Sequence, residues 1–139
     1  QLDLIAPKLS FLSIGTNDLT QFLFAADRSN PKLAERYDWL SPAILRFLRR
    51  VMLGVAGHNV DVTVCGEMGG RRLEALALLG LGIRRLSITP AAVGPIKELV
   101  RKIDLAEISA AMNGWLASPP QSMREALTQW AGARGIEVD

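Results

Sequence analysis

The sequence contains very little cysteine and histidine, with one residue of each among its 139 residues. A single cysteine, Cys65, cannot form an internal disulfide, so we expect a reducing, cytoplasmic environment or a thiol that is kept for chemistry. With so few of these side chains, a zinc site is not supported. Phosphate loops of the Walker type and dinucleotide-binding glycine fingerprints are missing as well.

Long apolar runs and an excess of one charge are also missing. No apolar run approaches the roughly 20 residues that a membrane helix needs, and no signal peptide is evident, so membrane contact is not expected. The net charge is only +2, and the basic pairs are scattered among acidic residues without interleaved aromatics, which argues against nucleic-acid binding. With 49% hydrophobic and 22% charged residues, the composition predicts one globular domain with a single core.

Strand-like and helical patterns alternate along the first two thirds of the chain. Strands are predicted at residues 10–14, 60–65 and 85–88, and helices at residues 19–25, 41–57 and 73–79, followed by helices only. Such alternation predicts parallel strand pairing with right-handed crossovers. Helix starts are expected at Ser41, Asp104 and Ser122, whose side chains are good N-caps. Residues 27–40 form an irregular segment, which is long enough to suggest a functional loop.

An amide and a carboxylate follow the first predicted strand, at Asn17 and Asp18. Asn and Asp are preferred N-caps, so one interpretation is that Asp18 begins the next helix and stabilises it by about 1 kcal/mol. The other interpretation is a magnesium ligand, because Mg²⁺ takes one or two carboxylates together with substrate phosphate. The Asn17 amide would then donate to a phosphate oxygen.

A thiol follows the second predicted strand, at Cys65. A lone cysteine beside valines is usually a buried small hydrophobe. A thiol at the carboxyl end of a strand, facing Gly66 and a helix start, can instead exchange protons, and both interpretations stay open. Glu67 is expected to orient this loop by accepting backbone N–H bonds. Arg28 is either a solvated loop residue or a bidentate clamp on phosphate or carboxylate.

These residues belong to phrases that resemble one enzyme family. Residues 13–21 read S-I-G-T-N-D-L-T-Q, residues 26–30 read A-D-R-S-N, residues 65–68 read C-G-E-M and residues 86–90 read L-S-I-T-P. Together they are similar to the C-terminal phosphoenolpyruvate (PEP)-binding domain of Enzyme I of the bacterial phosphotransferase system. The resemblance runs from about Leu2 to Lys102.

The resemblance implies a fold, a reaction and a set of roles. The fold is a TIM barrel, whose active site lies at the carboxyl ends of its strands. The reaction transfers the phosphoryl group of PEP to a protein histidine and releases pyruvate, with Mg²⁺ as cofactor. By position, Asn17 and Arg28 would contact the phosphate, Asp18 would contact the substrate and bind Mg²⁺, and Cys65 would protonate the enolate. We therefore expect Asn17, Asp18 and Cys65 to lie close together at one mouth of the barrel, where the strands end.

Two related families compete with this assignment. Pyruvate phosphate dikinase shares the G-T-N-D-L phrase and has two glycines where Gly69 and Gly70 stand, and PEP synthase diverges more around its cysteine. Met68 and residues 94–97 favour Enzyme I, with its nitrogen-related branch as one option. Arg71 departs from the sugar enzyme, which has an acidic residue in this place, so the charge and the helix cap of this loop differ from the family pattern.

The chain is shorter than a barrel, which takes roughly 250 residues. Since it also lacks an initiator Met, we expect residues 1–139 to be a single fragment, the C-terminal portion of the barrel, with three parallel strands and then helices. Upstream arginines, a glutamate and the acceptor histidine would lie in the parent, so the fragment alone is predicted to be inactive. Expected partners are PEP and pyruvate, a phosphocarrier of the HPr type through the parent's N-terminal domain, and a second copy in a homodimer. The alternative is a non-catalytic dimerisation or regulatory domain.

Overall fold

The computed structural model of the chain describes residues 1–27, 29–34 and 37–138 and contains one parallel sheet. Its strands are β1 (Phe11–Gly15), β2 (Asp61–Cys65) and β3 (Arg85–Ser87), in the order β1-β2-β3. In the register, Gly15 lies opposite Cys65, and Cys65 lies opposite Ser87. All three strands therefore end at the same edge of the sheet, as the alternating pattern predicted.

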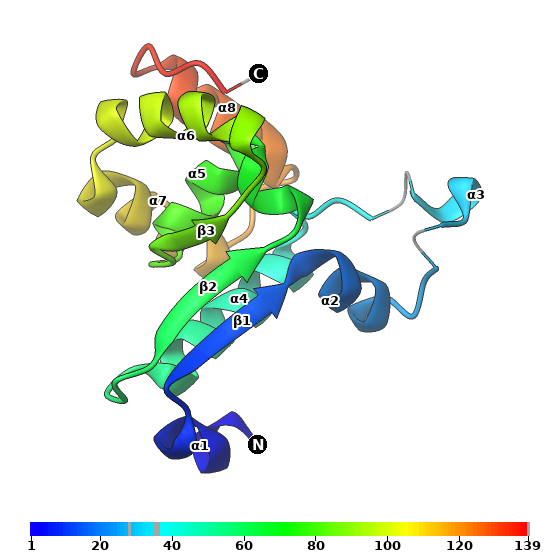
Figure 1. Ribbon diagram of the computed structural model, residues 1–139. Coiled ribbons are helices and arrows are strands. Elements are labelled where there is room, and N and C mark those ends of the chain that lie inside the picture. The colour runs from blue at the N-terminus through cyan, green and yellow to red at the C-terminus, as the bar shows by residue number, and fades with distance from the viewer. Residues whose placement is uncertain (28, 35–36, 139) are drawn as a thin grey trace.

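Helices connect the strands and then complete the chain (Figure 1). Between β1 and β2 lie α2 (Thr16–Leu23), α3 (Pro31–Ala34) and α4 (Pro42–Val55), and between β2 and β3 lie the 3-10 turn η2 (Glu67–Gly70) and α5 (Arg72–Gly80). The last part consists of α6 (Pro90–Lys102), α7 (Leu105–Ala117) and α8 (Met123–Gly132). A short helix α1 (Leu2–Ile5) and a 3-10 turn η1 (Ala6–Lys8) precede the sheet and were not predicted.

Three predicted helix starts are confirmed, and one is wrong. The side-chain oxygens of Ser41, Asp104 and Ser122 each accept backbone N–H bonds from the first turn of the following helix. Helix α2, however, begins directly after β1, with Gly15 as its N-cap, which makes Asp18 a residue of the first turn. The interpretation of Asp18 as an N-cap is therefore wrong, because the strand passes into the helix without an intervening loop.

One face of the sheet packs against helices. Alternate strand residues Ile14, Val62 and Val64 are buried and belong to the same apolar cluster as α4 and α5. Helix α5 is apolar almost all round, with every residue from Leu73 to Gly80 buried, since the later helices contact it from other sides. The core thus lies between the sheet and the helices that follow it.

The opposite face of the sheet is uncovered by the described residues. It carries Ser13, Thr63 and Ser87, together with an exposed ion pair in which Arg85 lies 2.9 Å from Asp61, and Phe11 is 68% exposed. Parallel sheets are normally covered on both faces. The structure therefore shows an open sheet of three parallel strands with helices.

Among the described residues, no helix is both long and apolar enough to cross a bilayer.

Removing the side chain of Leu48 from the core is expected to destabilise the protein by about 2–5 kcal/mol. Leu48 is completely buried in α4, whereas Leu53 of the same helix is 64% exposed. We therefore expect Leu53→Ala to change the free energy of unfolding by about 0.5 kcal/mol or less. Urea denaturation followed by circular dichroism measures both variants. Equal losses would contradict the packing described for α4.

Candidate functional site

The start of α2 and the loop after β2 are held together at the carboxyl edge of the sheet. The Thr16 hydroxyl, which is completely buried, donates to the backbone carbonyl oxygen of Cys65 at 3.1 Å. The backbone N–H of Glu67 donates to Oδ1 of Asn17 at 3.5 Å. These two bonds join residues about fifty positions apart in the sequence, and they set Asn17 beside the cysteine loop.

Gly66 makes this close approach possible. Its φ is +104°, which is a backbone conformation that L side chains rarely adopt. A Cβ atom at this position would lie 2.9 Å from Oγ1 of Thr16 and 3.2 Å from Oδ1 of Asn17. The loop can therefore pass this close to Thr16 and Asn17 only with glycine here.

The Cys65 thiol lies outside the core. The residue is a half-buried free cysteine on the uncovered face of the sheet, whereas its neighbour Val64 is fully buried. The Ser13 hydroxyl donates to Sγ of Cys65 across the two strands at 3.6 Å. Cys65 is thus half-buried rather than fully buried, and a role of its thiol in proton exchange stays a prediction.

Asp18 is exposed in the first turn of α2. Among the described residues, no group of three His, Cys, Asp or Glu side chains could hold a metal ion. Since Mg²⁺ commonly takes one or two carboxylates and completes its shell with substrate phosphate and water, a single Asp18 carboxylate fits a shared site of this kind. The predicted phosphate clamp, Arg28, lies outside the described residues.

Glu67 does not perform the role that we expected. Within residues 1–27, 29–34 and 37–138, its carboxylate accepts no backbone N–H bond, and only its own N–H is engaged, with Asn17. The loop is oriented through the amide of Asn17 rather than through the acid, because the tight turn at Gly66 brings the backbone of Glu67 to that side chain.

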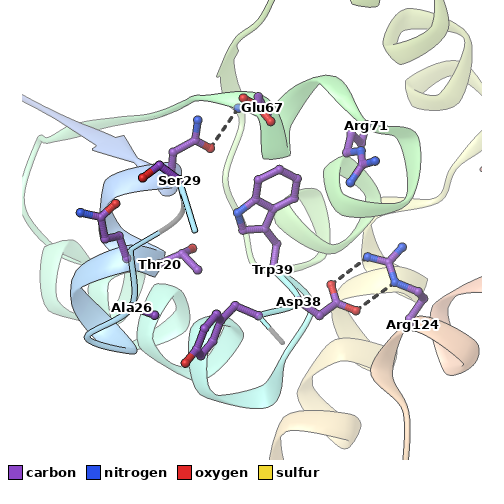
Figure 2. Close-up of a pocket in the computed structure, with 11 residues that line it drawn as sticks. Thr20, Ala26, Ser29, Asp38, Trp39, Glu67, Arg71 and Arg124 are labelled. Atoms are coloured by element: carbon purple, nitrogen blue, oxygen red, sulfur yellow. Dashed lines mark hydrogen bonds and ion pairs between the residues drawn. The ribbon is translucent and has the colours of Figure 1, made fainter. Parts of the chain in front are cut away.

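A cavity of about 710 Å³ opens beside this edge. Its size is typical of small-molecule sites. Figure 2 shows Trp39 in the middle of the lining, between Glu67, Arg71 and Asp38. The described lining residues are Asn17, Thr20, Gln21, Ala26, Ser29, Tyr37, Asp38, Trp39, Glu67, Arg71 and Arg124. Glu67 of the cysteine loop and Asn17, which accepts its backbone N–H, thus both line this cavity.

A three-membered ionic network closes one side of the cavity. Nε and Nη2 of Arg124 donate to the two oxygens of Asp38 at 2.9 and 2.8 Å, and Nη2 also donates to Oε1 of Glu74 at 2.7 Å. Burial raises the pKa of Asp38, but hydrogen bonds from Arg124 and from the Leu40 amide outweigh it, so the pKa lies below its ordinary value. The hydrogen bond to Asp38 raises the pKa of Arg124. Asp38 and Arg124 are therefore both charged at neutral pH.

Arg71 takes a place in the cavity wall instead of capping a helix. It is the N-cap residue of α5, yet its side chain makes no capping bond. Its guanidinium lies 5.4 Å from the centroid of the Trp39 ring, a cation–π contact, and 3.9 Å from the Glu74 carboxylate. A cation therefore lies over the Trp39 ring in the wall of the cavity.

The sequence interpretation missed most of this wall. Trp39, which the sequence analysis did not single out, packs against the core cluster and also lines the cavity. Asp38 and Arg124 stand 86 positions apart, and no local pattern connects them. The one available signal was the length of the irregular segment before Ser41, which contains both Asp38 and Trp39.

An open parallel sheet with helices defines an α/β domain, and domains of this class bind ligands at the carboxyl ends of their strands, where the amide, carboxylate and thiol of this chain stand. Residues 1–105 match the family model of the PEP-binding domain of PEP-utilising enzymes. The chain belongs to this family.

Curated relatives agree with this family. The phosphoenolpyruvate-protein phosphotransferase of Borreliella burgdorferi is 45% identical over 114 residues, which cover 82% of this chain and 20% of the relative. The phosphoenolpyruvate-dependent phosphotransferase system protein of Escherichia coli K12 is 44% identical over 103 residues, which cover 74% of this chain and 14% of the relative. A multiphosphoryl transfer protein of Xanthomonas campestris is 45% identical over 101 residues, which cover 73% of this chain and 12% of the relative. The chain thus spans a fifth or less of the length of these relatives.

Gly66→Ala is expected to destabilise the protein by about 2–4 kcal/mol, because it adds a steric clash to the strain of a positive φ. Gly57→Ala is the matched control, since Gly57 also has a positive φ of +85° but a Cβ there would meet nothing within 4 Å. The control should lose only about 1–2 kcal/mol of its free energy of unfolding. Thermal and chemical denaturation measure both losses. Equal losses would show that the contact between Gly66 and the start of α2 is looser than described.

Proposed function

We propose that this chain is the C-terminal part of the TIM-barrel, PEP-binding domain of a PEP-protein phosphotransferase. In this reaction the phosphoryl group of PEP passes to a protein histidine and pyruvate is released. The observation that carries the proposal is the arrangement of Asn17 and Cys65 at neighbouring strand ends, joined by the bond from the Glu67 amide to Asn17. Membership in the family supports it.

The proposed role of Cys65 follows from what the substrate leaves behind. When the bond between phosphorus and the enol oxygen of PEP breaks, the remaining enolate needs a proton on its methylene carbon to become pyruvate. A thiol is a suitable general acid, and Cys65 is half-buried at the edge of the sheet where Asn17 lies. Ser13, which donates to Sγ, would hold the sulfur in place.

The proposed roles of the polar residues concern the phosphate. The Nδ2 group of Asn17 donates to no acceptor among the described residues, where only Oδ1 is engaged, accepting from the Glu67 amide. This leaves Nδ2 free to donate to a phosphate oxygen. Arg28 is proposed to contact the phosphate as well. Phosphoryl transfer depends mainly on positioning and on charge neutralisation, which is what such donors provide.

Asp18 is the proposed Mg²⁺ ligand of this chain. Its exposed carboxylate, in the first turn of α2, lies next in sequence to Asn17 and so close to the proposed phosphate site. When bound, Mg²⁺ would neutralise charge on the phosphate oxygens. With one carboxylate from this chain, the rest of the coordination shell would come from substrate, water and residues of the parent protein.

The barrel and the parent protein are part of the same proposal. The free outer edges of β1 and β3 and the uncovered face with Ser13, Thr63 and Ser87 are what the end of a larger parallel barrel would present. The acceptor histidine, which would pass the phosphoryl group to an HPr-type phosphocarrier, would lie in another part of the parent.

A homodimer is proposed as the assembly in which this domain works. Helix α2, which carries Asn17 and Asp18, exposes the apolar side chains of Phe22 (79%) and Leu23 (39%). Apolar side chains of this size at the surface favour a contact with another protein surface. The same observation favours the second candidate function, a dimerisation or regulatory domain without catalysis.

Cys65→Ala in the full-length protein should slow pyruvate formation by about 100-fold or more, because the enolate loses its general acid. Ser87→Ala is the matched control, since Ser87 lies opposite Cys65 at the same sheet edge and has no proposed role. Stopped-flow measurement of pyruvate formation and thermal denaturation compare the two variants. Unchanged turnover in Cys65→Ala would remove the thiol from the mechanism and favour the non-catalytic alternative.

The chain by itself should not transfer the phosphoryl group of PEP and should bind PEP weakly, with a Kd of about 1 mM or higher, because too few cationic donors are present. Isothermal calorimetry with PEP, with and without Mg²⁺, measures this, and the full-length protein serves as the positive control. Tight, Mg²⁺-dependent binding by the isolated chain would show that its site is complete without the rest of the barrel.

A further inference from the structure

Helix α8 reaches the cavity through a single side chain. Arg124 lies in its first turn and is one of the residues that line the cavity, together with Asn17 and Glu67. The family match ends at residue 105, so α8 lies beyond it. A residue outside the family region thus contacts the wall of the candidate site.

We infer that Arg124 is a positioning residue, which from α8 holds Asp38, and with it Trp39, in the wall of the cavity that Asn17 and Glu67 also line. The inference rests on the proposed function, since it assigns Arg124 an effect on the binding of PEP. The guanidinium of Arg124 is engaged by Asp38 and Glu74, and its proposed effect passes through Asp38.

The geometry at Asp38 shows why one arginine can hold this segment. Two parallel bonds from Arg124 engage both carboxylate oxygens, a bidentate pairing that fixes orientation as well as distance. Oδ1 of Asp38 also accepts the Leu40 amide at 2.9 Å, and the Asp38 carbonyl accepts the Ser41 amide at 2.9 Å. Arg124 therefore holds the turn that leads directly into the cap of α4.

The buried carboxylate of Glu74 anchors the arginine on its other side. Glu74 is only 2% exposed, and Arg124 donates to it at 2.7 Å, while Arg71 lies farther away at 3.9 Å. A carboxylate buried to this extent requires a close cationic partner. Arg124 is thus held by the core at Glu74 and holds the cavity wall at Asp38.

Trp39 is confined between these contacts. Its backbone follows Asp38 directly, and the guanidinium of Arg71 covers its ring. Figure 2 shows the ring between Arg71 on one side and Thr20, Ala26 and Ser29 on the other. If Arg124 is removed, this wall has to be ordered when the substrate binds, which weakens binding without altering the groups that react.

The test measures KM for PEP and kcat in the full-length protein for Arg124→Gln, for Arg124→Lys and for a double variant. The double variant combines Glu74→Gln with Arg124→Gln, so that no buried carboxylate is left unpaired. Arg134→Gln is the matched control, because Arg134 follows the same helix and also makes an ion pair (2.8 Å to Glu107) and a ring contact (4.1 Å to Trp130), away from the cavity.

We expect KM to rise about tenfold in Arg124→Gln and in the double variant, with kcat unchanged, as when one or two side chains must be ordered on binding. In Arg124→Lys, KM should rise less than in Arg124→Gln. In Arg134→Gln, KM should stay within about twofold of the value for the unchanged protein. Hydrogen exchange at the amides of Leu40 and Ser41 should become faster in the Arg124 variants only.

Two outcomes separate the inference from the function on which it rests. If the unchanged protein turns over PEP but the Arg124 variants keep its KM, or change it no more than Arg134→Gln does, the positioning role is wrong and the proposed function stands. If kcat falls with KM unchanged, the role is also wrong. If the unchanged protein does not turn over PEP, the proposed function fails, and the inference fails with it.

Discussion

The parallel pairing of β1 with β2 is the constraint on which the site depends. Because Gly15 lies opposite Cys65, both strands end at one edge, and a shift of the register by a single residue would move the thiol to the other face of the sheet. The bonds from Thr16 to the Cys65 carbonyl and from the Glu67 amide to Asn17 then keep the start of α2 beside the cysteine loop. Buried Ile14, Val62 and Val64 oppose such a shift, since it would turn the apolar side chains of one strand away from the helices.

The sheet and its neighbouring helices could be predicted from the sequence, because their signals are local. Alternating valines before Cys65 and the cap at Ser41 carry their structure in a few neighbouring residues. The start of α2 could not be predicted in this way. Asn17 and Asp18 are strong cap formers, but the buried Thr16 hydroxyl bonds to the neighbouring strand end, so tertiary contact decides where the helix begins.

The two parts of the candidate site, the strand-end residues and the cavity wall, also differ in how far the local sequence predicts them. Asn17, Asp18 and Cys65 stand in phrases that could be recognised, although their chemical roles remain predictions. The wall of the cavity depends on Asp38, Glu74 and Arg124, which come from three separate parts of the chain. Nothing near Arg124 distinguishes it in sequence from Arg134, which pairs elsewhere, so only the folded arrangement shows which arginine reaches the cavity.

The position of the lone thiol on the uncovered sheet face has a consequence for handling the protein. Since the chain has one cysteine, air oxidation can produce a disulfide only between Cys65 of two molecules, or a sulfenic acid and its further products. A crosslink of this kind would set the open faces of two sheets toward each other and occupy the sulfur in both. Preparations kept without a reductant would then contain covalent pairs whose ligand edge is blocked, although each copy remains folded.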